Sequence, residues 1–308
     1  MAVSAKDVSS LRAKTGVGMM ECKKALEEAN GNFDEAIKLL KEKGLAVAAK
    51  KAERIAAEGI VDILYDEAIK TAAMIEVNIE TDFAAKNELF HAFIKDCLKI
   101  IMKERPADID EFLKKPYDGG ATVDEALKEK ILVIGEKITI RRFVIVEGII
   151  NTYIHNKGAI GVIVAVNADE KAAADEGFNE FRKNLALQIA SMKPIYISKE
   201  DIPASIIEEE RENIITQIKE DAANAKKPAN VIEKMVEGRI TKYIDNNCLL
   251  EQDYIKEDKM TVRDYIESYR KQSGSEVSVD KFFRYEKGEG IEKREDNLAE
   301  EIAKLTGQ

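Results

Sequence analysis

The chain has 308 residues, 45 % of them hydrophobic and 34 % charged, and its formal net charge is −10. This length favours two or three domains, and this hydrophobic content is sufficient for packed cores, which excludes a largely disordered chain. The acidic balance argues against direct nucleic-acid binding, because such binding normally requires a basic face.

Residues 1–52 are predicted to form a small domain of three helices. The first helix is expected to end at Thr15-Gly16 and the second at Asn30-Gly31, and Asn32 is placed to cap the third. Lys43-Gly44 is expected to close that third helix, and an Ala/Lys-rich helical linker follows over residues 45–57. Such a small unit has a thin core, so its stability is marginal.

Two adjacent methionines in the second helix have different predicted positions. Met19 shares an apolar stripe with Cys22 and Leu26, which favours a place in the core. Met20 lies off that stripe and close to a glycine loop. It is therefore the better candidate for an adaptable contact with another molecule.

Residues 53–147 and 148–290 are predicted to be two copies of one unit. Gly59 and Gly148 each open a strand–turn–strand–helix pattern. At a nearly constant offset, Asn78 matches Asn167, Phe90 and Phe93 match Phe178 and Phe181, and Cys97 and Ile101 match Leu185 and Ile189. A unit present twice shows which features the fold itself requires.

The strand-to-helix corner of the first copy contains an acid and an aromatic residue, Asp82 and Phe83. Thr81 or Asp82 is placed to cap a helix that is predicted to run to about Glu104. One interpretation makes Phe83 the start of the apolar stripe of that helix. The other exposes the corner for contact with another molecule, as connecting segments often do.

The second copy helps to choose between these interpretations. It reads Ala168-Asp169-Glu170-Lys171-Ala172 at the corresponding position, without a counterpart of Thr81-Asp82-Phe83. The fold is therefore not expected to need this corner, which favours a functional role for it.

An antiparallel helical hairpin is predicted over residues 203–245, inserted into the second copy. Its arms have apolar residues at helical spacing, and its tip is predicted at Lys226-Lys227-Pro228. The last segment, residues 291–308, carries Leu298, Ile302 and Leu305 at helical spacing and is predicted to be an amphipathic tail that packs on a partner. The predicted fold class is α+β.

Few residues are candidates for catalysis or for binding a phosphate or a metal. Arg141 and Arg142, on an apolar strand, are expected to be ion-paired structural residues rather than a phosphate site, and His155 is expected to be structural. The chain has no Gly-Lys dipeptide, hence no P-loop, and no Cys or His at metal-ligand spacing. We therefore expect no cofactor, no metal and no enzymatic reaction.

The cysteines and the hydropathy indicate the compartment. Cys22, Cys97 and Cys248 are odd in number and far apart, which is typical of a reduced, cytoplasmic protein. No apolar run has membrane-spanning length and the first residues lack a signal-peptide pattern, so no contact with a membrane is expected.

Several of these segments resemble the elongation factor Ts family. The most specific are Leu11-Arg12-x-x-Thr15-Gly16-Val17-Gly18-Met19-Met20 and Val77-Asn78-x-Glu80-Thr81-Asp82-Phe83-x-Ala85-Lys86-Asn87. Further family-like segments are Ile134–Arg142, Tyr153–Val162, Glu233–Arg239 and Phe283–Glu292, in the same order as in the family. Family members often have Asp-Met-Ala-Met-His where this chain has Asn184-Leu185-Ala186-Leu187-Gln188, so a role that needs an imidazole is in doubt.

The resemblance implies a guanine-nucleotide exchange factor for elongation factor Tu, with a ubiquitin-associated-like domain at residues 1–52 and a coiled-coil arm. Thr81, Asp82, Phe83 and Ala84 would disturb the Mg²⁺ site of the partner, with Phe83 as a wedge. Leu11, Arg12, Met19 and Met20 would contact the partner from the N-terminal domain. Leu187 and Gln188 would do so from the second copy.

A different class of function stays open. The chain is alternatively an adaptor that uses its N-terminal domain to bind another protein, and the two hypotheses differ in whether the Thr81–Phe83 corner matters for binding. A homodimer is possible but is not predicted.

Overall fold

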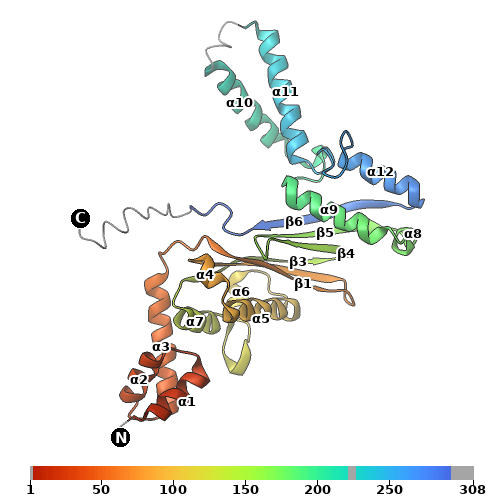
Figure 1. Cartoon of the computed structure of the whole chain (residues 1–308). Helices are drawn as coiled ribbons and strands as arrows, with labels where there is room; N and C mark the ends of the chain where they lie inside the picture. Colours follow the sequence, from red (N-terminus) through yellow and green to blue (C-terminus); the bar gives the residue numbers. More distant parts are fainter. Residues whose placement is uncertain (1–2, 221–226, 293–308) are drawn as a thin grey trace.

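The computed structural model describes residues 3–220 and 227–292 and has an α+β fold, as predicted. Two three-stranded antiparallel sheets form its centre, and each is covered by helices on its outer face (Figure 1). The N-terminal helices and a long helical arm lie at opposite ends of the molecule (Figure 1). The predicted tail residues Leu298, Ile302 and Leu305 lie outside the described residues.

The three predicted N-terminal helices are confirmed as α1 (Ala5–Thr15), α2 (Met19–Glu28) and α3 (Phe33–Lys51). The side chain of Asn32 caps α3 by accepting hydrogen bonds from the backbone of Asp34 and Glu35. A shared core fixes the three helices and includes Leu11, Cys22, Leu26 and Leu40.

The expectation that Lys43-Gly44 closes α3 is wrong, because the helix continues for two more turns to Lys51. Gly44 lies where α3 crosses α7 (Val123–Ile134), and a Cβ atom there would lie 3.4 Å from the carbonyl oxygen of Lys128. The glycine thus permits close helix packing rather than ending the helix. The N-terminal helices are consequently fixed against the first half of the core.

The first sheet consists of β1 (Glu58–Asp66), β2 (Thr71–Ile79) and β3 (Ile138–Glu147). Its outer face is covered by α5 (Glu88–Glu104), α6 (Ile109–Leu113) and α7. A capping box between Thr122 and Glu125 begins α7, and α6 was not predicted. Phe90 and Phe93 are fully buried under this sheet.

The single helix predicted from the corner to Glu104 is also wrong. The structure has a one-turn helix, α4 (Asp82–Ala85), and then α5, which Asn87 caps by accepting a hydrogen bond from the backbone of Leu89 at 2.8 Å. The break re-orients the chain, so α4 does not share the apolar stripe of α5.

The second sheet repeats the first. It consists of β4 (Ile149–His155), β5 (Ile160–Ala168) and β6 (Val277–Glu286), with α8 (Glu170–Ala174), α9 (Phe178–Met192) and α12 (Val262–Ser273) on its outer side. The third strand of each sheet carries a β-bulge at the same place: Arg141 of β3 is the extra residue opposite Glu76 and Val77, and Asp280 of β6 is the extra residue opposite Ala165 and Val166. The predicted duplication is therefore visible in strand order and in register.

The two sheets lie face to face, which buries β2 on both sides. Val61, Met74, Ile150 and Ile163 belong to an apolar layer between them. Every residue of β2, from Thr71 to Ile79, is buried for this reason.

The predicted hairpin is present as α10 (Ala204–Glu220) and α11 (Ala229–Asn247). A small apolar seam of its own, which includes Ile214, Ile218, Val236 and Ile240, holds the arms together. The arm projects away from the sheets (Figure 1). Its predicted tip residue Lys226 lies outside the described residues. Short 3₁₀ turns occur at Asp118–Gly120 and Lys199–Asp201.

Candidate functional site

The corner after β2 presents an aromatic side chain to solvent. Thr81 caps α4, its hydroxyl accepting a hydrogen bond from the backbone N–H of Ala84 at 3.1 Å. Ala84 and Ala85 are buried against the core, at 6 % and 8 % exposure. Phe83 is 83 % exposed, the largest exposed fraction among the large apolar side chains described. The interpretation that Phe83 starts the core stripe is therefore wrong.

Asp82 is exposed beside Phe83 and carries a negative charge at neutral pH. Its carboxylate accepts a hydrogen bond from Nζ of Lys86, one turn later, at 2.8 Å. This bond and the positive charge of Lys86 lower the pKa of Asp82 below its ordinary value. The corner thus offers an apolar ring and an ionised carboxylate side by side.

The second copy has a corner of the same shape, which corrects the expectation that it lacks one. Asp169 caps α8 by accepting from the backbone N–H of Ala172 at 2.8 Å, as Thr81 caps α4. Ala172 is fully buried, like Ala84, and exposed Lys171 occupies the position of Phe83. The fold therefore requires the capped turn but not the aromatic ring.

A carboxylate of another segment holds the first corner in place. Glu136, in the turn between α7 and β3, accepts hydrogen bonds from the backbone N–H of Thr81 at 3.0 Å and from its hydroxyl at 2.8 Å. In return, Glu80 accepts from the backbone N–H of Lys137 at 2.6 Å. Sequence reasoning assigned no role to Glu80, Glu136 or Lys137, although both glutamates stand in family-like motifs.

Arg141 and Arg142 are ion-paired as predicted. Both contact Glu76, a fully buried carboxylate, at 3.0 and 2.6 Å. Glu76 also accepts from the backbone N–H of Gly288 at 2.8 Å, and the guanidinium of Arg142 lies over the ring of Tyr285 at 4.1 Å. This network ties the loop after β6 to the first sheet.

Gly288 is required at that contact. Its φ is +68°, and an added Cβ would lie 2.1 Å from the carbonyl oxygen of Ala57. The Gly288-x-Gly290 pair is thus a turn that lets the loop after β6 lie directly on the chain before β1.

The candidate N-terminal contact residues divide into two groups. Arg12, Met19 and Met20 are exposed, the two methionines at 42 % and 64 %. The core position expected for Met19 is therefore wrong. Leu11 is fully buried in the three-helix core, so it shapes this surface from below without forming part of it.

The two candidate residues of α9 are largely occupied within the chain. Leu187 is half-buried and Gln188 is fully buried. The side-chain amide of Gln188 donates to Gln252 at 3.2 Å and to the carbonyl of Asp253 at 3.0 Å, and its oxygen accepts from the backbone of Ile255 at 3.0 Å. In this structure Gln188 fixes a loop and has no face directed to a partner.

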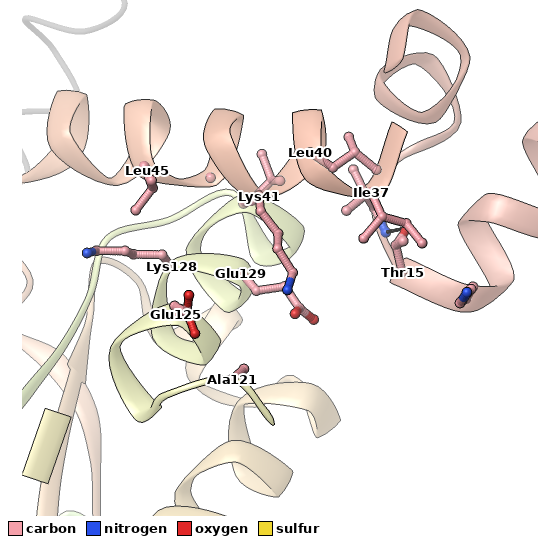
Figure 2. A pocket seen from close by; sticks show the side chains of 13 residues that line it. Thr15, Ile37, Leu40, Lys41, Leu45, Ala121, Glu125, Lys128 and Glu129 are labelled. Atoms are coloured by element: carbon pink, nitrogen blue, oxygen red, sulfur yellow. Dashed lines mark hydrogen bonds between the residues drawn. The ribbon is translucent and has the colours of Figure 1, made fainter. Parts of the chain in front are cut away.

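A hollow of about 220 Å³ lies beside the crossing of α3 and α7 (Figure 2). Leu40 and Leu45 come from α3, and Lys41 points toward Glu129 of α7 (Figure 2). The hollow therefore lies at the junction between the N-terminal helices and the core, and it does not include the Phe83 corner. Over residues 3–220 and 227–292, no group of three His, Cys, Asp or Glu side chains is arranged to hold a metal ion.

His155 is exposed, and its Nδ1 lies 3.0 Å from the hydroxyl of Tyr153. Among the described helices, none combines the length and the apolar composition needed to cross a membrane.

Comparison with known proteins identifies the family. The family model described as elongation factor TS matches residues 80–289. The elongation factor Ts of a Clostridium botulinum strain is 44 % identical over 309 residues, covering 99 % of this chain and 100 % of that protein. Those of Clostridioides difficile and of a Nitratiruptor species are 45 % and 42 % identical, each covering 98 % of this chain and 98 % and 99 % of their own lengths.

The match extends over nearly the whole chain and includes the corner that bears Phe83. The chain belongs to the elongation factor Ts family and is a factor of the elongation phase of translation.

Proposed function

We propose that this chain binds GDP-bound elongation factor Tu and accelerates GDP release, so that the GTPase can be reloaded with GTP. Family membership supports the partner, and the 83 % exposure of Phe83 on a rigid, capped turn is the observation that carries the mechanism. An exposed aromatic ring of this kind is unfavourably solvated in the free protein, and its burial on binding is favourable.

The physical task of an exchange factor is to weaken the hold of a GTPase on its nucleotide. A GTPase binds the phosphates of GDP through backbone N–H groups and a Mg²⁺ ion. Binding free energies are linked, so a factor that lowers the affinity for GDP is itself bound less tightly when GDP is present. The factor therefore needs contacts that are compatible only with the distorted nucleotide site.

The corner offers such contacts. Burial of the Phe83 ring in the partner would contribute about 1.5–3 kcal/mol toward the distortion. The carboxylate of Asp82 would act on the Mg²⁺ shell through hydrogen bonds or fix the entry of the turn. Thr81 and Ala84 contribute by holding the turn, since the Thr81 hydroxyl is used within the chain and Ala84 is buried. No metal or nucleotide is assigned to this chain itself.

Other surfaces would add the area that a stable complex requires. Exposed Arg12, Met19 and Met20 lie on the N-terminal helices, and Leu187 is partly accessible on α9. We divide the chain accordingly into the N-terminal domain (1–52), two core copies (53–147 and 148–290, with the arm inserted in the second) and the tail (291–308). The proposed site of action is cytoplasmic, and neither nucleic acid nor a membrane takes part.

The test is release of a fluorescent GDP analogue from elongation factor Tu, with catalytic amounts of the chain. We expect strong acceleration over spontaneous release. With a folded chain and a competent GTPase, unaccelerated release would contradict the proposal and leave the adaptor function, in which Arg12, Met19 and Met20 bind a different protein.

A further inference from the structure

The turn between α7 and β3 forms a reciprocal clasp with the Phe83 corner. The carboxylate of Glu136 accepts from the N–H and the hydroxyl of Thr81, and the carboxylate of Glu80 accepts from the N–H of Lys137. Two consecutive residues on each side are thus paired with two on the other. Charge-assisted hydrogen bonds of this kind are stronger and more directional than neutral ones.

The equivalent joint in the second copy is made differently. There the backbone N–H of Asp169 donates to the backbone carbonyl of Glu276 at 3.1 Å, and the N–H of Glu276 donates to the carboxylate of Asp169 at 3.1 Å. Glu276 and Lys137 each precede the third strand of their sheet. One backbone carbonyl in the second copy is therefore replaced by the Glu136 side chain in the first.

The two joints differ in whether a side chain from the turn before the third strand contacts the capping residue. The second corner shows that the backbone of Glu276 and the capping carboxylate of Asp169 suffice to close the joint where the exposed residue is Lys171. In the first corner, the added carboxylate fixes both polar groups of Thr81, the residue that caps the turn bearing Phe83. A capped turn held at its first residue has less freedom, and the ring it carries is presented in one direction.

The same turn is attached to the end of the N-terminal helices. Nζ of Lys137 donates to the carbonyls of Ala52 at 2.6 Å and Arg54 at 2.7 Å, and the guanidinium of Arg54 contacts Glu80 at 3.2 Å. Three segments that are distant in the sequence thus meet at the corner: the chain after α3, the end of β2 and the start of β3. Glu136 lies at their junction.

We propose that Glu136 is a positioning residue for nucleotide exchange, which acts by fixing Thr81 and thereby the direction of the Phe83 ring. The inference rests on the proposed exchange function. It predicts that Glu136→Ala slows GDP release at saturating chain by about tenfold, because two hydrogen bonds that orient the corner are lost. Glu136→Gln keeps an acceptor for Thr81 and restores at least half of the wild-type rate.

The second copy supplies the matched control. Glu276→Ala removes a largely exposed side chain at the equivalent joint, whose hydrogen bonds come from the backbone, and leaves the release rate unchanged. Because Glu136 is proposed to act through Phe83, Glu136→Ala changes the rate less than twofold when it is added to Phe83→Ala. Residues that act as one unit show this non-additivity.

A readout independent of exchange separates failure of this inference from failure of the proposed function. The chain contains no tryptophan. A Phe83→Trp variant therefore carries one indole at the corner, whose local motion is measured by time-resolved fluorescence anisotropy. We expect Glu136→Ala, but neither Glu136→Gln nor Glu276→Ala, to enlarge the fast component of the decay.

The outcomes are distinct. An unchanged anisotropy decay in Glu136→Ala would overturn the inference, whether or not the chain catalyses exchange. Full additivity of Glu136→Ala with Phe83→Ala would also overturn it, since Glu136 would then act elsewhere. A wild-type chain that fails to accelerate GDP release would overturn the proposed function alone, because the anisotropy still reports on the corner.

Discussion

The two corners of the duplicated core share a capped turn, which we call the frame. They differ in the exposed residue that the turn carries, which we call the tip. Thr81 and Asp169 each cap a short helix, and Ala84 and Ala172 are buried at the same position in it. The residue directly before the buried alanine is Phe83 in the first copy and Lys171 in the second, and both are exposed. The frame is thus a property of the fold, while the ring belongs to one copy and has no role in packing within the chain.

The strands behind the corners differ in a second way. The third strand bulges at the same place in both sheets, but the middle-strand residue that precedes the register shift is the buried carboxylate Glu76 in β2 and the buried residue Ala165 in β5. Glu76 binds two arginines and the loop after β6. A charged network in the first copy therefore binds the loop after β6 of the second copy, in addition to the apolar layer between the sheets.

The largest effect is expected at this attachment. Glu76→Ala leaves the partly buried Arg141 without a carboxylate and Arg142 with only the exposed Glu289, so we expect the free energy of unfolding to fall by about 3 kcal/mol. Urea denaturation measures it. Glu289→Ala is the control: it removes an exposed partner of Arg142 and should cost less than about 1 kcal/mol. Equal losses in the two variants would show that burial of Glu76 adds nothing.

The next-largest effect is expected when the exposed residue of each corner is replaced. Phe83→Ala should slow GDP release from elongation factor Tu by about 10- to 100-fold, because the ring burial that opposes GDP binding is lost. Lys171→Ala should leave the rate unchanged. Neither variant should alter the free energy of unfolding by more than about 0.5 kcal/mol, since both side chains are exposed.

A smaller effect tests the shared frame. Thr81→Ala and Asp169→Ala each remove a helix cap and should each lower the free energy of unfolding by about 1 kcal/mol. In the exchange assay only Thr81→Ala should be slow. If Asp169→Ala slowed exchange equally, the distinction between a structural frame and a functional tip would fail.

The smallest effect concerns charge at the tip. The bond to Lys86 lowers the pKa of Asp82, so its stabilising contribution is present above the unfolded-state pKa and is lost as the pH falls through the folded-state pKa. The difference in thermal midpoint between wild type and Asp82→Asn should therefore be small at neutral pH and vanish in acid. We expect Asp82→Asn to slow exchange only about two- to threefold; a wild-type rate would show that the charge is irrelevant.

Local patterns were sufficient to predict much of this fold. Asn32 caps α3 where the sequence places it, and repeated aromatic positions revealed the duplication. Predictions failed where tertiary contacts decide the outcome. Gly44 is a packing glycine because α7 crosses α3, and Met19 is exposed although it lies on an apolar stripe.

The residues of the candidate site were predicted, but its construction was not. The family resemblance implies Thr81, Asp82, Phe83 and Ala84 as contact residues, while Glu136 is 55 positions from Thr81 and no local pattern connects them. Met19 lies on an apolar stripe, yet no neighbouring helix covers it well enough to bury it. For Gln188, no local pattern indicates the loop around Gln252 and Asp253 that uses its amide.

We propose that the exposed ring of Phe83 drives nucleotide release. The most direct measurement is the rate of release of a fluorescent GDP analogue from elongation factor Tu by stopped flow, at chain concentrations that saturate the complex, for wild type and Phe83→Ala. The account predicts that both chains saturate and that the plateau rate of Phe83→Ala is at least about tenfold lower. Equal plateau rates would contradict it.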